Sequence, residues 1–212
     1  MKCRIDEIAK LQPGQLLTRI REVDDPDVSG YVVYSGKHFL ADSFQLGPDD
    51  GKQDKVIRTE EDVMLVEPEM LLISLTTNKA VIVSEAHEGH LLTSNYIRVD
   101  YDSSKIDPNY FCYVYNESDA VRKQIAMNEQ GASLVSRLSL QQLRKFELLC
   151  PALEEQQRVG AIYHLQQKRE LLQLEKIRLE KLAVHALLNT YLQGRNYNEY
   201  ISKTKSATSG IT

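Results

Sequence analysis

One stretch, residues 151–192, constrains the fold more than any other part of this 212-residue chain. It contains a single proline, at its first position, and a single glycine, Gly160; Gly194 follows the last apolar residue. Proline suits the first turn of a helix, and glycine commonly ends one. The stretch therefore predicts a helix of about 40 residues, which would be roughly 60 Å long at 1.5 Å per residue. A compact domain does not need so long a helix for its own core.

The predicted helix is apolar on two sides. One row has members seven residues apart: Leu165, Leu172, Leu179 and Ala186. A second row lies on roughly the opposite face: Leu174, Ile177, Val184, Leu188 and Tyr191. A helix with two apolar faces needs two partners, or one partner and its own domain. Two interpretations stay open, a helix packed on its own globule and a coiled coil that recruits another helix, and the pattern favours the second.

The composition indicates the cellular compartment of the protein. No run approaches the roughly 18 apolar residues of a membrane span, and the N-terminus MKCRIDEIAK lacks the pattern of a signal peptide. The three cysteines, Cys3, Cys112 and Cys150, are odd in number and share no CxxC spacing. That favours reduced thiols over a disulfide framework or a zinc site. We therefore expect a cytoplasmic protein without membrane contact.

Charge is unevenly divided along the chain. Residues 1–150 hold 17 Lys and Arg against 24 Asp and Glu, a net of −7, whereas residues 151–212 hold 9 against 6, a net of +3. An acidic globular part argues against broad, nonspecific nucleic-acid binding, which depends on neutralising phosphates. Any DNA contact there would need a local patch.

Residues 1–150 predict an α+β or mostly-β globule. Alternating apolar runs between turn residues predict strands at 18–21, 30–34, 55–58, 62–66, 70–75, 80–83, 95–99 and 146–149. Helical stretches are predicted at 109–116, 118–127 and 139–143, the last with Ser139 as its N-cap. The chain thus divides into a globular domain, a long helix and a polar tail, at residues 1–150, 151–193 and 194–212.

Three motifs suggest chemistry at first sight. Residues 87–90, HEGH, have the wrong histidine spacing for a metalloprotease helix, so a solvated loop is the better interpretation. Residues 107–110, DPNY, come near the Asp-Pro-Pro-Tyr motif of amino-methyltransferases, but without a methyl-donor site they indicate a helix start. Residues 26–27 and 50–52, PD and DGK, loosely fit a nuclease pattern within turn-rich segments. None of these forms a catalytic constellation.

Several stretches together resemble the specificity (S) subunit of type I restriction–modification enzymes. The similar segments are the predicted hairpin at 71–83, the following strand at 92–99, the helix entry at 107–111 and the domain exit at 138–151. Residues 153–159, LEEQQRV, are similar to the Pro-Leu-x-x-Glu-Gln-x-x-Ile opening of the family's long spacer helix. The likeness covers about residues 55–192. The family's usual hairpin glycines are missing at 74–79, and the chain resembles half a subunit, with one recognition domain and one helix.

The resemblance implies a division of labour. A target recognition domain would read one half of a bipartite sequence in double-stranded DNA, and antiparallel helices would fix the gap between the halves. A half-subunit would then pair through an antiparallel coiled coil, as a homodimer or with a different half-subunit. The other apolar face would bind modification (methyltransferase) subunits. Chemistry would belong to those and to the restriction subunits, so this chain is expected to be no enzyme and to hold no cofactor; S-adenosylmethionine would bind the methyltransferase subunit.

Candidate contact residues follow from this resemblance and from the need for hydrogen-bonding side chains at loop tips. For DNA bases they are Thr76, Thr77, Asn78 and Lys79 in the hairpin turn, with Ser133 and Arg137 near the domain exit. For phosphates they are Lys37, His38 and Arg58. For the dimer or partner interface they are Leu165, Leu172, Leu174, Ile177, Leu179, Val184, Leu188 and Tyr191.

Two alternatives stay open. An orphan half-subunit could be an interaction protein, a competitor that occupies modification subunits without productive DNA recognition. The acidic charge of the globular domain supports this alternative. A single-chain nuclease is the other, and the missing catalytic constellation argues against it.

Overall fold

The computed structural model describes residues 1–47, 51, 53–129 and 138–208, with only the backbone given for 129 and 194–208. The chain forms two compact units, Met1–Lys168 and Arg169–Thr212. The first, called the globular unit below, contains strands β1 to β8 and the first turns of the long helix α6. The second contains the rest of α6.

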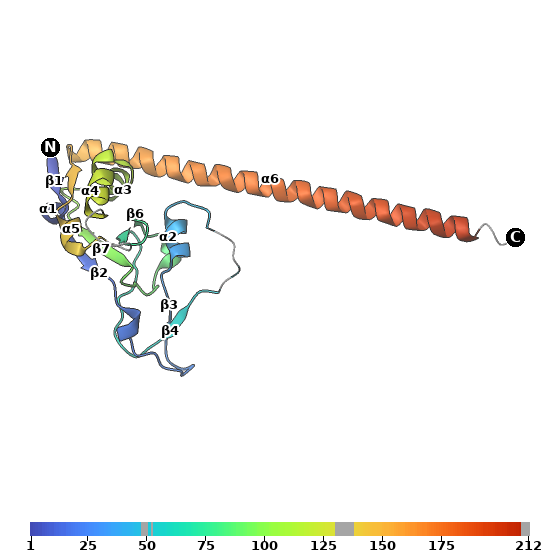
Figure 1. Cartoon of the computed structure of the whole chain (residues 1–212), viewed down its shortest axis with the longest axis horizontal. Helices are drawn as coiled ribbons and strands as arrows, with labels where there is room; N and C mark the ends of the chain where they lie inside the picture. The colour runs from blue at the N-terminus through green and yellow to red at the C-terminus, as the bar shows by residue number, and fades with distance from the viewer. Residues whose placement is uncertain (48–50, 52, 130–137, 209–212) are drawn as a thin grey trace. The chain divides into compact units, whose positions relative to one another are not determined.

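The fold is α+β (Figure 1). The strands are β1 (Lys2–Arg4), β2 (Ala9–Pro13), β3 (Gly30–Val32), β4 (Val56–Arg58), β5 (Leu71–Ser74), β6 (Lys79–Ile82), β7 (Tyr96–Tyr101) and β8 (Glu147–Leu149). The helices are α1 (Ile5–Ile8), α2 (Gly36–Asp42), α3 (Pro108–Glu117), α4 (Asp119–Glu129), α5 (Leu140–Arg144) and α6 (Leu153–Thr208), with short 3₁₀ turns η1 (Leu17–Arg19) and η2 (Glu85–His87).

A four-stranded antiparallel sheet, in the order β2-β7-β5-β6, is the centre of the globular unit. In β5 all four residues are buried, which is why its sequence is continuously apolar up to Ser74. The register sets Leu71 between Val99 of β7 and Ile82 of β6. Two further strand pairs, β1 with β8 and β3 with β4, lie outside this sheet.

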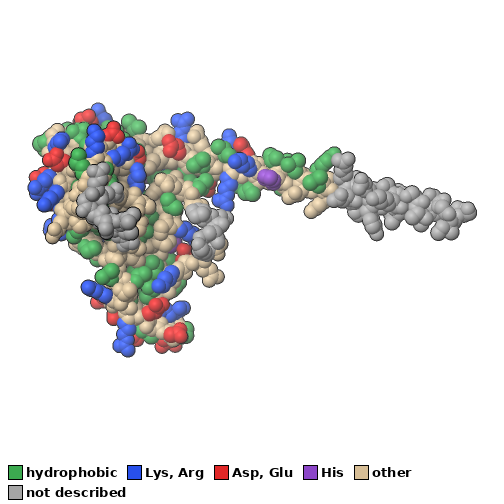
Figure 2. Space-filling model, in the orientation of Figure 1, with side chains coloured by type: hydrophobic (Ala, Val, Ile, Leu, Met, Phe, Trp, Pro, Cys, Tyr) green, Lys and Arg blue, Asp and Glu red, His purple; other side chains and the backbone are tan. Residues whose placement is uncertain are grey.

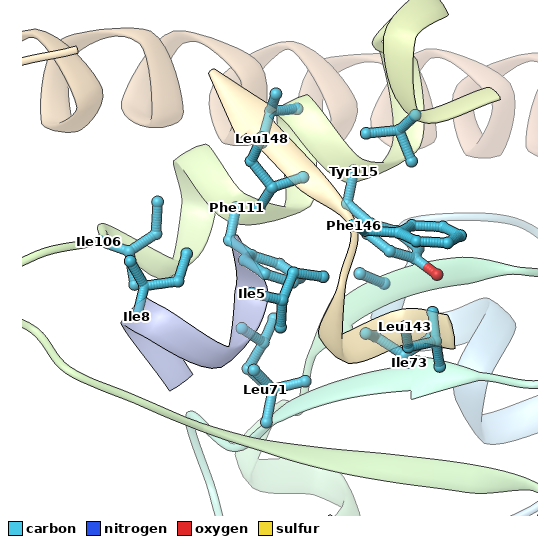
Figure 3. Close-up of a cluster of buried hydrophobic side chains, with 14 of the residues drawn as sticks. Ile5, Ile8, Leu71, Ile73, Ile106, Phe111, Tyr115, Leu143, Phe146 and Leu148 are labelled. Carbon is cyan, nitrogen blue, oxygen red and sulfur yellow. The ribbon is translucent and has the colours of Figure 1, made fainter. Parts of the chain in front are cut away.

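The main core fills the space between this sheet, α1, α3 and α5. Figure 3 shows Ile5 of α1 close to Phe111 of α3 and Leu71 of β5, and all three side chains are fully buried. The rings of Phe111 and Tyr115 are stacked 5.6 Å apart, one turn apart on α3. A second apolar cluster around Tyr34 and Leu72 occupies the other side of the sheet.

The two ends of the globular unit are joined. Strand β1 pairs with β8, so that Cys3 lies opposite Leu148, and the Cys150 N–H donates to the Met1 carbonyl. Cys3 and Cys150 form a disulfide with their Cα atoms 6.0 Å apart. The expectation of three reduced thiols is therefore wrong for this pair, because strand pairing brings together cysteines 147 residues apart. Cys112 is a buried free thiol, as expected.

Helix α6 is anchored to the globular unit by its first turns. Gln156 is 1% exposed; its side chain accepts from the Asp107 N–H (3.1 Å) and donates to the carbonyls of Lys105 (3.1 Å) and Pro151 (2.9 Å). A Cβ added at Gly160 would lie 2.5 Å from Asp107 Oδ1 and 2.6 Å from the Tyr110 nitrogen. Glutamine and glycine, one turn apart, thus let α6 lie directly on the N-terminus of α3.

The long helix is confirmed, but its predicted ends are not. It begins at Leu153 rather than at Pro151, and it continues through Gly194 to Thr208. A glycine inside a helix costs only about 1 kcal/mol relative to alanine, so Gly194 does not have to stop it. No helix in the part of the chain that the structure describes is long and apolar enough to cross a membrane.

Most predicted elements of the globular unit are present, and the exceptions have a common cause. The predicted strand at 62–66 is absent. Leu65 forms only an isolated bridge with Leu91, the Val66 N–H donates to the carbonyl of residue 90, and the Met64 carbonyl accepts from the N–H of residue 92. The predicted strand at 18–21 is also absent, and its first two residues belong to the turn η1. Strands β1 and β2 and helices α1 and α2 were not predicted. These short segments take their conformation from tertiary contacts rather than from local pattern.

Candidate nucleic-acid interface

The turn between β5 and β6 is held by its own hydrogen bonds. The N–H groups of Thr76 and Thr77 donate to Ser74 Oγ, at 3.3 and 3.2 Å, and the Asn78 N–H donates to the Ser74 carbonyl at 2.9 Å. Asn78 has a φ of 51°, in the left-handed region that asparagine tolerates better than most residues. Asparagine is therefore suited to this position of the turn. Thr76 and Thr77 are exposed at the tip, and the Thr76 hydroxyl also lies 2.9 Å from Ser74 Oγ.

The side chain of Lys79 is 43% exposed and reaches back toward α3. Its Nζ donates to the Asn116 carbonyl at 2.7 Å and lies 3.7 Å from Glu117 Oε1, both at the end of α3. Asn116 also pairs with both backbone groups of Ala80, at 2.7 and 2.8 Å, and so covers part of the exposed edge of β6. A base contact by Lys79 would therefore have to compete with these partners.

Lys37 and His38, the predicted phosphate contacts at the start of α2, face the same carboxylate. Lys37 Nζ lies 3.5 Å and His38 Nε2 3.2 Å from Asp54 Oδ1. His38 is only 5% exposed, and its Nδ1 accepts from the Ser35 N–H at 3.1 Å. Burial lowers the pKa of His38, which Asp54 partly opposes. A buried imidazole with both nitrogens engaged does not serve as a phosphate contact in this conformation.

His87 is tied to a buried carboxylate and does not lie in a solvated loop. The side chain of Asp42 is 0% exposed and lies 2.9 Å from His87 Nδ1. It also accepts from the hydroxyl of Tyr34 at 2.5 Å and from the Ser84 N–H at 3.1 Å. Burial, together with Asp42, raises the pKa of Tyr34 far above its ordinary value, so the hydroxyl stays a donor. The solvated-loop interpretation of residues 87–90 is wrong for His87 because α2 packs against it.

Three histidine rings gather at this point. The ring centroid of His38 lies 4.9 Å from that of His87 and 4.7 Å from that of His90. The ring centroids of His87 and His90 are 5.4 Å apart. Across the described ranges no group of three or more His, Cys, Asp or Glu side chains is placed to hold a metal ion. The ring contacts of His38 with His87 and His90 join α2 to the segment after β6.

The DPNY motif is a helix start, as predicted. Asp107 is the N-cap of α3 and accepts from the Tyr110 N–H at 2.8 Å. Tyr110 is buried, and its hydroxyl donates to the Leu149 carbonyl at 2.8 Å. The motif thus links α3 to β8 and to the beginning of α6.

Arg58 lies exposed at the end of β4, and segments that bond to the β3–β4 ribbon or adjoin it carry three cations that sequence reasoning missed. These are Arg19, Arg21 and Lys55, all exposed. Backbone bonds from Val23 to Arg58 and from Val33 to Lys55, at 2.9 and 2.8 Å, bring their segments together. Figure 2 shows Lys and Arg side chains over this part of the globular unit, interspersed with Asp and Glu. Their separation in sequence left no local signal for this grouping.

Some candidates lie outside the described residues. These are Ser133 and Arg137 of the predicted base contacts, and Asp50 and Lys52 of the nuclease pattern. The DNA contacts proposed for the first two stay predictions.

The predicted interface residues of α6 are exposed. Leu165 is 63%, Leu172 56% and Leu179 65% exposed in the first row. The second row is exposed to a similar degree, with values from 48% at Ile177 to 68% at Tyr191. Apolar side chains exposed in a continuous row are typical of a surface that binds another protein.

Comparison with solved structures finds this arrangement in restriction–modification proteins. The HsdS subunit from Thermoanaerobacter tengcongensis superposes with a TM-score of 0.51 and 16% identity, over 83% of this chain and 39% of that one. The fold is that of a type I restriction–modification S subunit. A chain from work on complex assembly and conformational transition of the type I R-M system gives a TM-score of 0.54, with 16% identity over 85% of this chain and 41% of that one.

The first two structures share the fold with this chain at 16% sequence identity. The S subunit of the type I system from M. genitalium aligns at 13% identity over 84% of this chain and 43% of its own, with a TM-score of 0.49. This chain spans about two fifths of the length of these structures. No protein-family description and no curated protein matches the chain.

Proposed function

We propose that this chain is a non-catalytic, half-length specificity subunit of a type I restriction–modification system. Its globular unit reads one half of a bipartite sequence in double-stranded DNA, and α6 joins it to a second half-subunit. Modification and restriction subunits supply the chemistry, including the S-adenosylmethionine site. The observation that carries the proposal is the S-subunit fold, which is found over 83% of this chain.

The proposal accounts for the exposed apolar rows of α6. An isolated helix with such rows would be poorly soluble and would gain free energy by burying them against other helices. A half-length subunit needs two such contacts, one for the second recognition unit and one for a modification subunit. Both rows therefore have an expected partner.

DNA contact is proposed at the tip of the β5–β6 turn and on the β3–β4 ribbon. Thr76 and Thr77 are exposed hydroxyls on a turn that is already ordered, so little conformational entropy is lost when they bind. Arg58 and its neighbours can contact phosphates, which adds affinity without sequence preference. Because the globular unit is acidic overall, we expect the assembled complex to bind DNA much more tightly than this chain alone.

The central experiment is reconstitution of methylation. The chain is expressed with a type I modification subunit, and adenine methylation of host DNA is mapped by sequencing. An interrupted sequence methylated only when both proteins are present is the expected result. If a homodimer reads it, the two half-sites are inverted repeats of each other.

The contact residues are tested in the same complex by mobility shift. A Thr76→Ala, Thr77→Ala double variant should lose discrimination between specific and unrelated DNA, at about 1–3 kcal/mol per contact. Lys123→Ala, which removes an exposed cation on α4, is the matched control for the variant of Arg58. Arg58→Ala should weaken binding to both DNAs and lower the salt dependence by about one phosphate contact. Unchanged binding by both the double variant and Arg58→Ala would contradict the proposed contact residues.

A second candidate, a competitor that binds modification subunits without reading DNA, is favoured by one observation. Several cations of the globular unit are already ion-paired on the protein, among them Lys37 with Asp54, Lys79 with Glu117 and Lys2 with Glu147. A competitor would co-purify with the modification subunit and lower methylation by the native specificity subunit. Methylation of a new sequence would exclude it.

A further inference from the structure

The second apolar row of α6 belongs to a heptad seam. Together with two charged positions it advances by alternating steps of four and three residues: Glu170, Leu174, Ile177, Lys181, Val184, Leu188 and Tyr191. This alternation is the pattern of a coiled-coil interface, whereas the other row advances by seven only and forms a narrower line. The seam lies entirely in the helical second unit.

The apolar members of the seam are all exposed in the single chain. Leu174 is 49%, Ile177 48%, Val184 54%, Leu188 54% and Tyr191 68% exposed. Together they cover about five turns of helix at 3.6 residues per turn. One partner helix, packed along the seam, would cover all of them.

The two charged positions select the orientation of that partner if it is a second copy. In a parallel pair each seam residue faces itself, so Glu170 would face Glu170 and Lys181 would face Lys181 of the partner. Like charges that face each other within a seam are destabilising and determine which alignment forms. In an antiparallel pair each position faces a different one, and both repulsions disappear.

One antiparallel register matches the seam to itself. It pairs Leu174 with Tyr191, Ile177 with Leu188 and Lys181 with Val184, each pair occurring twice about a two-fold axis between Leu182 and Ala183. The aliphatic stem of lysine can pack on valine while its ammonium group reaches water. All five apolar seam residues are then covered, and each isologous contact is repeated by symmetry.

The neighbouring registers are worse. A shift of one heptad in one direction sets Leu188 against Glu170 and Ile177 against Lys181. The opposite shift sets Tyr191 against Lys181 and moves Leu174 and Ile177 away from the other apolar seam residues. The first shift therefore adds a second charged residue, Glu170, against an apolar side chain, where it loses hydration without gaining a partner. The opposite shift leaves two apolar seam residues, Leu174 and Ile177, uncovered by the seam.

We propose that this seam, rather than the row containing Leu165, Leu172 and Leu179, is the contact with a second copy of the chain. The two helices run antiparallel in the register that pairs Ile177 with Leu188. This inference rests on the proposed function, since it gives the half-subunit its second recognition unit. It leaves the other row free for a partner of a different kind, such as a modification subunit.

Cysteine cross-linking of the full chain tests the register. Three matched double variants report the three antiparallel registers: I177C with L188C for the proposed one, and I177C with K181C or V184C with L188C for the two shifts. I177C alone reports a parallel pair. Each variant is oxidised with a mild disulfide reagent, run on a non-reducing gel, and its linked peptides are identified by mass spectrometry, which also separates links to the native cysteines.

The expected result is a predominant covalent dimer for I177C with L188C, and only background dimer for the other three variants. A predominant dimer in another variant, with the native chain dimeric by sedimentation, overturns the register but leaves the proposed function standing. A dimer with no cross-link in any variant overturns the choice of seam. A native chain that stays monomeric at high concentration overturns both this inference and the proposed homodimer.

Discussion

Replacing Gln156 should lower the free energy of unfolding of the globular unit. One buried side chain makes three hydrogen bonds, to the Asp107 N–H and to the carbonyls of Lys105 and Pro151. These groups belong to the loop before α3 and to the entry of α6. We expect Gln156→Ala to loosen both segments together.

The magnitude follows from these contacts. A typical intramolecular hydrogen bond contributes about 1 kcal/mol net, and a buried group left without its partner costs about 1–3 kcal/mol. Three lost bonds, together with the lost packing of a 1% exposed side chain, give a loss of about 3 kcal/mol. For a unit of this size that corresponds to a melting temperature lower by about 6–12 °C.

The measurement is urea unfolding followed by tyrosine fluorescence, since the chain has 11 tyrosines and no tryptophan. All variants are compared at one protein concentration because dimer formation changes apparent stability. Gln157→Ala is the matched control: it is the same residue type, next in the same helix, but exposed. Its effect should stay within about 0.5 kcal/mol.

A second variant separates packing from hydrogen bonding. Gln156→Leu keeps most of the side-chain volume but none of the bonds, so it should be almost as damaging as Gln156→Ala. If Gln156→Ala unfolds at the same urea concentration as Gln157→Ala, the Gln156 side chain does not anchor α6. If only the leucine variant is tolerated, packing rather than hydrogen bonding decides.

Three further predictions use the same unfolding assay or sedimentation. Gly160→Ala should destabilise by about 1–3 kcal/mol, because the new Cβ meets the Tyr110 nitrogen at 2.6 Å; helix propensity alone predicts a gain of about 1 kcal/mol, so a gain would contradict the close packing. Burial lowers the pKa of His38, so the unfolded state takes up its proton first on acidification and stability falls as the pH drops below about 6.5. His38→Gln should remove up to about 1.4 kcal/mol per pH unit of that slope, and an equal effect of His185→Gln, exposed on α6, would reject this origin. Lys181→Leu should tighten the dimer at least about tenfold by sedimentation, and Lys176→Leu, off the seam, should not.

The sequence by itself determined the long helix, its two apolar rows and the order of most strands. These features depend on local periodicity, which is set by backbone geometry and is visible wherever one face of an element is apolar. The sequence also placed the hairpin turn at Thr76 and Thr77, because a short polar segment separates two apolar runs. The resemblance to S subunits depended on the order of these same elements, and the fold bears it out.

Only the tertiary structure decided which of the candidate side chains face solvent. Lys79 and His38 looked alike in the sequence as exposed polar residues, but one reaches back to α3 and the other is buried against Asp54. The Cys3–Cys150 disulfide and the three-histidine cluster were equally hidden. The positions of Lys79 and His38, the disulfide and the histidine cluster all depend on contacts between segments far apart in the chain. The local sequence pattern does not indicate such contacts.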